Sequence, residues 1–165
     1  MVAAGPGKLH PHTGVRIKNP VSAGMSVLFS EYSGSPMVYN DEQVSMIRDD
    51  DVMMYYKGAQ MTKENVTPCR DYVLVKIEAE KSETASGIVV AQSVTKDNVP
   101  CEGIVFKVGE GRMSSTGDFT PSPCGVGDKV KFRDYAGNEV KIQGERFSLT
   151  RMVDILCVIE DEGEN

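Results

Sequence analysis

Short segments in which apolar and polar side chains alternate recur along the chain and predict β-strands. A period of two places the apolar residues on one face of a strand, and these segments are rich in β-branched and aromatic residues. Gln143 and Gly144 follow one such segment where a turn is needed, and Gly tolerates the positive φ of tight turns. The pattern predicts an all-β fold, a small barrel or sandwich, with strands at 72–77, 103–108, 129–132, 139–142 and 155–159.

The chain repeats itself over more than half of its length. Residues 27–34 (VLFSEYSG) align with 130–137 (VKFRDYAG) at an offset of 103, which holds without a gap as far as Val52 and Ile155. The glycine pair of 5–7 matches that of 109–111 at an offset of 104. Tyr32 and Tyr135 recur at the same place, which favours a shared packing role over a ligand site. The sequence therefore predicts two related units in tandem.

The two units are expected to be unequal. The region 62–105 of the second unit has no counterpart before Met1, so Met1 falls inside an expected strand. We interpret this as a truncated gene model or a fragment in preference to a naturally shortened domain. The expected division is a partial first unit (1–58), a linker (59–65), a complete second unit (66–161) and a tail (162–165). As written, the first unit would keep an unpaired sheet edge open to strand pairing.

Composition and charge narrow the range of functions. Twenty-one Val against five Leu, with 16 Gly and 8 Pro, favour strands and turns. A net charge of -6 gives no electrostatic reason to approach a phosphate backbone, so nucleic acid is not an expected partner. The apolar runs are far shorter than the roughly 20 residues of a membrane span, so no membrane span is expected.

The chemistry-bearing residues predict neither a metal site nor a catalytic centre. The four cysteines lack any Cys-x-x-Cys pair, which argues against zinc and favours free, mostly buried thiols. His10 and His12 flank Pro11 without nearby carboxylates and are expected in a solvent loop. No Ser, His and Asp or Cys and His constellation is available, so the chain is not expected to be an enzyme.

Two polar segments stand out between the expected strands. Residues 78–98 are mostly polar around Gly87, Ile88, Val89 and Val90, and the apolar triplet could equally be an ordinary buried strand on these residues alone. Residues 113–123, which include Met113, Gly117, Asp118 and Phe119, indicate an exposed hairpin or arch, and a featureless solvent loop fits them as well.

At these residues the sequence resembles the GroES-type, ten-kilodalton co-chaperonins. The resemblance covers about 66–161, and the first unit repeats its latter half. Two units in one chain resemble the twenty-kilodalton tandem co-chaperonin of plastids. The matching motifs are DYVLVK (71–76), GIVV (87–90), EGIV (102–105), VGEG (108–111), VGDKV (126–130), YAGNEVKI (135–142) and DIL (154–156).

The resemblance implies a co-chaperonin without chemistry of its own. Irregular β-barrels would form a homo- or mixed ring that caps a sixty-kilodalton-type chaperonin, and unfolded proteins would be substrates only indirectly. The partner would bind and hydrolyse ATP, so no cofactor is expected here. In that family the loop matching 78–98 is mobile when free, and Gly87 and Ile88–Val90 would dock on the chaperonin. Met113, Gly117, Asp118 and Phe119 would belong to a roof hairpin.

Other functions and compartments stay open at this point. A small β-barrel module that binds oligonucleotides or oligosaccharides is the alternative function, because short strands alone permit it. The acidic charge and the absence of Trp disfavour it. The resemblance implies the chloroplast stroma, with the mitochondrial matrix or the cytoplasm as alternatives.

Overall fold

The chain folds almost entirely into β-strands, as predicted. The computed structural model describes residues 1–77, 101–134 and 136–160. Unit one contains the strands and one 3₁₀ turn, in chain order, β1 (Gly7–Leu9), β2 (Arg16–Lys18), β3 (Ser26–Phe29), β4 (Ser35–Tyr39), β5 (Glu42–Met46), η1 (Asp49–Asp51) and β6 (Val52–Tyr56). Unit two contains β7 (Val66–Pro68), β8 (Tyr72–Lys76), β9 (Glu102–Val108), β10 (Arg112–Met113), β11 (Phe119–Thr120), β12 (Lys129–Phe132), β13 (Asn138–Ile142), β14 (Glu145–Arg151), η2 (Met152–Asp154) and β15 (Ile155–Ile159).

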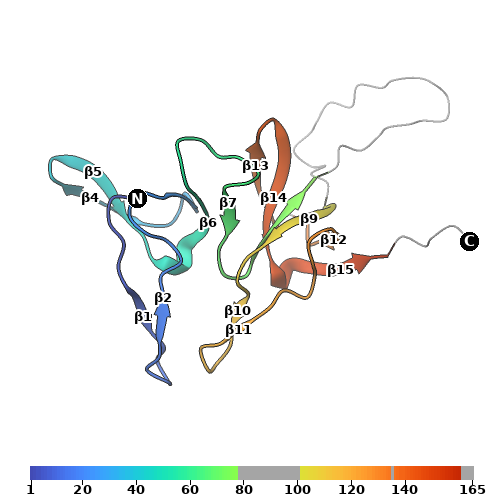
Figure 1. Ribbon diagram of the computed structural model, residues 1–165, viewed down its shortest axis with the longest axis horizontal. Coiled ribbons are helices and arrows are strands. Elements are labelled where there is room, and N and C mark those ends of the chain that lie inside the picture. The colour runs from blue at the N-terminus through green and yellow to red at the C-terminus, as the bar shows by residue number, and fades with distance from the viewer. Residues whose placement is uncertain (78–100, 135, 161–165) are drawn as a thin grey trace, which may run out of the picture.

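The tandem repeat is confirmed element by element. Every element from β3 to β6 begins 103 residues before its counterpart between β12 and β15. The β3–β6 and β12–β15 pairs even share a register shift at the same place, between Leu28 and Phe29 and between Lys131 and Phe132. In Figure 1 the two units lie side by side, unit one from blue to cyan and unit two from green to red.

A six-stranded sheet in the order β13-β14-β8-β9-β12-β15 is the main sheet of unit two. Its central strand β8 is buried on both faces, since Val73, Leu74 and Val75 are fully covered. Val73 and Val75 pack into a core with Val105, Val130 and Phe132 on one side of the sheet. Leu74 points to the opposite side, so β8 separates two apolar clusters.

The second cluster lies between the units. Strand β6 of unit one pairs with β7 of unit two, with Met54 opposite Pro68. Met53 and Met54 of β6 share one buried cluster with Phe147 and Leu149 of β14. The units are thus joined by backbone hydrogen bonds and by a common core, which explains why strands far apart in sequence are adjacent here.

Strand β14 is the main element that the sequence pattern missed. It pairs with β13 on one side and β8 on the other, and four consecutive residues, 147–150, are buried. Its Ser148 and Thr150 are buried polar residues, which hid the apolar alternation of Phe147 and Leu149. The turn expected at Gln143 and Gly144 does connect β13 to β14, and both residues have positive φ.

Two other expectations from the sequence are settled by burial. Tyr32 is 91% exposed, so the predicted packing role for this recurring tyrosine was wrong in unit one, and Tyr135 lies outside the described residues. Cys69, Cys124 and Cys157 are free thiols, as expected, but only the first two of these are buried, whereas Cys157 is exposed. Within the described part of the chain, no helix has the length and apolar character to cross a membrane.

Candidate functional site at the paired hairpins and the unit junction

The segment expected to be a hairpin or a featureless loop contains two short paired strands. Met113 of β10 lies opposite Phe119 of β11, so these two predicted site residues face each other in the ladder. At the tip, the Ser114 amide donates to the Asp118 carbonyl at 2.7 Å, and the Thr116 hydroxyl donates to the Asp118 carboxylate at 2.9 Å. Gly117 adopts a φ of 92°, which a glycine takes without strain.

Unit one carries a corresponding hairpin, β1–β2, which the strand pattern did not reveal. Both hairpins start at a glycine in the left-handed region, Gly7 and Gly111, 104 residues apart. A Cβ on Gly7 would lie 2.0 Å from the Ile17 carbonyl oxygen, and one on Gly111 2.1 Å from that of Thr120. Only glycine fits, so the recurring glycine motif was the available signal for this hairpin.

The tips of the two hairpins lie close together (Figure 1). The His10 ring from the first hairpin lies 3.5 Å from where a Cβ on Gly117 would stand. His10 is only 5% exposed, so the expectation that it lies in a solvent loop was wrong. Its Nδ1 accepts a hydrogen bond from the Thr13 amide at 3.2 Å, which orients the ring inside its own turn. His10 is therefore a packing residue between the hairpins.

Arg70 joins the two units at the base of the hairpins. Its guanidinium donates to the Lys18 carbonyl at 3.1 Å and to the Asp49 carboxylate of unit one at 3.3 Å. It also lies 3.4 Å from the Glu110 carboxylate and 5.1 Å from the centre of the Phe119 ring in unit two. The sequence pattern offered no signal for this residue, because its partners come from four separate segments.

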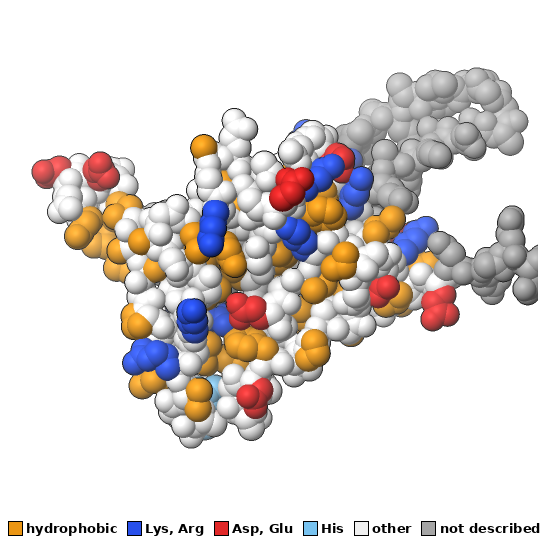
Figure 2. Space-filling view, in the orientation of Figure 1, with side chains coloured by type: hydrophobic (Ala, Val, Ile, Leu, Met, Phe, Trp, Pro, Cys, Tyr) orange, Lys and Arg blue, Asp and Glu red, His pale blue; other side chains and the backbone are white. Residues whose placement is uncertain are grey.

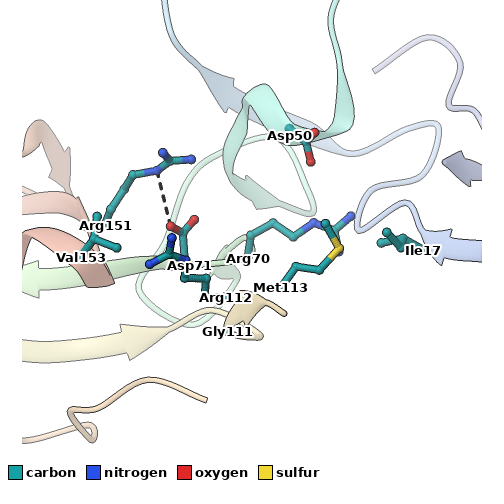
Figure 3. Close-up of a pocket in the computed structure, with 9 residues that line it drawn as sticks. All are labelled: Ile17, Asp50, Arg70, Asp71, Gly111, Arg112, Met113, Arg151 and Val153. Carbon is teal, nitrogen blue, oxygen red and sulfur yellow. Dashed lines mark ion pairs between the residues drawn. The ribbon is translucent and has the colours of Figure 1, made fainter. Parts of the chain in front are cut away.

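A pocket of about 390 Å³ lies beside Arg70, between β2, η1 and unit two (Figure 3). Figure 3 shows Arg151 directed at Asp71, and these side chains form an ion pair at 3.6 Å. Arginines and aspartates therefore line the pocket together, and the charges are largely compensated. The residues that line it are Ile17, Asp50, Arg70, Asp71, Gly111, Arg112, Met113, Arg151 and Val153.

The described residues offer little reactive chemistry. No cluster of three or more His, Cys, Asp or Glu side chains in these ranges could hold a metal. Burial, reinforced by the Glu110 carboxylate, raises the pKa of the Cys69 thiol to about 12, which keeps it protonated and unreactive at neutral pH. The predicted docking residues Gly87, Ile88, Val89 and Val90 lie outside the described residues. The geometry present supports packing between the two units.

Truncating Arg70 should loosen the junction. Its side chain and that of Asp49 are only 11% and 14% exposed, so Arg70→Ala leaves a largely buried carboxylate without its partner. We expect the free energy of unfolding to fall by about 3 kcal/mol, measured by urea denaturation. Arg146→Ala is the matched control, because the side chains of Arg146 and its partner Glu139 are 38% and 42% exposed and this ion pair should contribute about 1 kcal/mol or less. Equal losses for the two variants would contradict the role of Arg70.

Comparison with known proteins matches both units separately. The family model described as the chaperonin 10 Kd subunit matches residues 1–56 and 65–159. The chain belongs to the chaperonin 10 Kd subunit family. The two matched segments contain β1–β6 and β7–β15, so the tandem organisation seen in the strands is also a tandem of family matches.

The relatives of this chain include a long protein and many short ones. It is 27% identical to the "20 kDa chaperonin, chloroplastic" of Arabidopsis thaliana over 96% of the chain and spans 61% of that relative. It is 36% identical to the "Co-chaperonin GroES" of Ruthia magnifica over 58% of the chain and 99% of that relative. The GroES of Nitrosomonas eutropha is 42% identical over 58% of the chain and 98% of its own length.

Proposed function

We propose that this chain is a co-chaperonin that caps an ATP-driven chaperonin of the sixty-kilodalton type and so assists protein folding. The observation that carries the proposal is the coincidence of two family matches with two structurally repeated units. The chain does no chemistry itself and uses no cofactor, because the partner binds and hydrolyses ATP. The plastid name of the long relative supports the chloroplast stroma as its compartment.

The docking element of the proposal is Gly87 with the apolar triplet Ile88, Val89 and Val90. Burying a branched apolar side chain in a groove contributes about 1.5 to 3 kcal/mol. Ordering the flanking residues costs about 1 to 2 kcal/mol each, so one triplet alone binds weakly. Several triplets held in a ring bind at a high effective concentration, and a modest weakening of each by ATP turnover releases the whole ring. The β10–β11 hairpin, with Met113, Gly117, Asp118 and Phe119, is assigned to the roof of this ring.

The junction between the two units within the chain supports the proposed ring. Met53 and Met54 of β6 are buried against unit two. Their counterparts in unit two, Leu156 and Cys157 of β15, are exposed, the first by 57%. We therefore assign β15 to contact with the next subunit, which repeats the internal junction. That subunit is another copy of this chain or a different family member in a mixed ring.

Capture on an immobilised sixty-kilodalton-type chaperonin tests the proposed function. We expect retention of the full chain, alone or mixed with a single-unit co-chaperonin, only when ATP or ADP is present. Retention without nucleotide would argue against capping, and so would a lack of retention under all of these conditions. A gel shift with oligonucleotides in the absence of chaperonin would support the binding-module alternative.

A charge on the exposed face of β15 should prevent ring assembly. Leu156→Asp places a carboxylate where the repeat requires apolar contact, and an unpaired buried charge is costly. We expect the assembled species to be replaced by single chains, as measured by sedimentation velocity. The matched control is Val126→Asp, since Val126 is 65% exposed and lies on a loop outside this strand. A ring that survives Leu156→Asp would exclude β15 as the subunit contact.

A further inference from the structure

Most of the charged side chains that line the pocket at the unit junction already have a partner. Arg70 lies between two carboxylates, one from each unit. Arg151 pairs with Asp71 at 3.6 Å, and Asp50 pairs with Lys8. Both aspartates of the lining and two of its three arginines are therefore engaged in ion pairs within the fold.

Arg112, on β10, is the exception in this lining. Its side chain is exposed, and among the described residues no carboxylate lies within ion-pairing distance of its guanidinium. A guanidinium presents a planar fork of N–H donors whose geometry matches the two oxygens of a carboxylate or of a phosphate. Arg112 thus brings an uncommitted cation with several donors to the wall of the pocket.

Apolar side chains form another part of the lining and come from both units. Ile17 belongs to unit one, and Met113 and Val153 belong to unit two. In Figure 3, Val153 lies on one side of β10 and Ile17 on the other. Val153 is 46% exposed, so apolar surface at this pocket remains open to contact. The volume of about 390 Å³ is within the range of small-molecule sites in proteins.

The charge of the lining favours a monoanion as the ligand. Three arginines face two aspartates in it, so one positive charge is in excess. A phosphate monoester carries nearly two negative charges at neutral pH, and the second would be repelled by Asp50 and Asp71. Figure 2 shows basic and acidic side chains close together near the base of the hairpins, a mixed surface that does not attract a polyanion. A carboxylate matches a single guanidinium in both charge and shape.

We propose that this pocket binds a small organic monocarboxylate, with the carboxylate on Arg112 and the apolar body against Ile17, Met113 and Val153. The ligand contacts residues of both units, because the lining comes from both. Its binding therefore stabilises the junction against unfolding to an extent that rises with its concentration. The site is separate from the proposed docking triplet and from the β15 contact, and the proposal does not depend on capture by a chaperonin.

Isothermal titration calorimetry of the full chain with cinnamate tests the proposal. Cinnamate combines one carboxylate with an apolar body, and we expect saturable binding of one molecule per chain. Cinnamamide keeps the shape without the charge, and acetate keeps the charge without the apolar body, so both should bind about tenfold more weakly or worse. Equal affinity for cinnamamide would show apolar adhesion and overturn the proposal. Tighter binding of phenyl phosphate, or no binding of cinnamate, would also overturn it.

Substitution of Arg112 locates the carboxylate. Arg112→Ala should weaken the binding of cinnamate about tenfold or more and leave that of cinnamamide unchanged. Val153→Asp should weaken cinnamate as well, because it adds a negative charge to the lining. Arg146→Ala is the matched control, since Arg146 is an arginine outside the pocket that pairs with Glu139. Circular dichroism verifies that each variant keeps its fold. Unchanged affinity of Arg112→Ala for cinnamate would place the ligand elsewhere and overturn the proposal.

The methionines provide an independent measure of where the ligand lies. With labelled methyl groups, cinnamate should shift the NMR signal of Met113, which lines the pocket. The signal of Met54 should stay in place, because Met54 is fully buried in the core shared by the units. Cinnamate should also raise the urea midpoint of the unsubstituted chain and not that of Arg112→Ala. A shift at Met54 without one at Met113, or an equal rise of both midpoints, would contradict the assigned site.

Discussion

Val89→Asp is expected to abolish capture by the chaperonin while the co-chaperonin ring stays assembled. The substitution replaces a branched apolar side chain of the proposed docking triplet by a carboxylate that an apolar groove cannot pair. Each triplet then loses about 1.5 to 3 kcal/mol or more. The loss recurs at every loop of the ring, so apparent affinity should fall on the order of 100-fold or more.

The measurement is retention on an immobilised chaperonin in the presence of ATP, together with the sedimentation coefficient of the free variant. Ser93→Asp is the matched control, because it adds the same charge to the same polar segment outside the triplet. Unchanged retention of Val89→Asp would remove the triplet from the docking role. Loss of the ring itself would show that the segment acts in assembly.

Phe147→Ala is expected to cause the largest loss of stability among substitutions in the described core. Phe147 is fully buried in the cluster between the units and packs against Phe106, with ring centres 5.2 Å apart. Its removal should lower the free energy of unfolding by about 3 to 5 kcal/mol, from lost burial and from the cavity left behind. Because the cluster is shared, urea denaturation should show both units weakened.

The repeat supplies the control for this substitution. Val44 is the counterpart of Phe147 in unit one and is only partly buried on β5, which pairs with β4 alone among the described residues. Val44→Ala should cost about 1 kcal/mol or less, because a smaller side chain is removed and water already reaches the site. A loss equal to that of Phe147→Ala would mean that the two hairpins have equivalent surroundings, which would contradict this difference in burial.

Individual strands and turns could be predicted from the sequence because each depends on residues that are adjacent in the chain. Alternation predicted β9, β12 and β13, the apolar run 155–159 predicted β15, and the turn at Gln143 and Gly144 followed from the glycine, which tolerates positive φ. The run 72–77 predicted β8 but did not show that both of its faces are buried. Strand β14 escaped notice because buried Ser148 and Thr150 interrupt its apolar pattern, and only pairing on both sides makes it a central strand.

Some features of the candidate site were also indicated by the sequence, and others were not. The recurring glycines at Gly7 and Gly111 marked the start of both hairpins, because a Cβ at either position would collide with a carbonyl. No sequence pattern predicted that His10 packs against the second hairpin. No sequence pattern predicted that Arg70 pairs with both Asp49 and Glu110 either, since these partners come from separate segments.

The sequence by itself determined the all-β class, the tandem repeat and the family, because each follows from the order of residues along the chain. Only the tertiary structure decided how the units join, which hairpins lie close together and which strand edges are paired among the described residues. Those properties depend on distances between segments as far apart as Met53 and Phe147, which are set by the packing of the shared core. The same Glu-to-Arg strand is central in the sheet of one unit, whereas in the other it pairs with β4 alone among the described residues, because β8 pairs with β14 and not with β5.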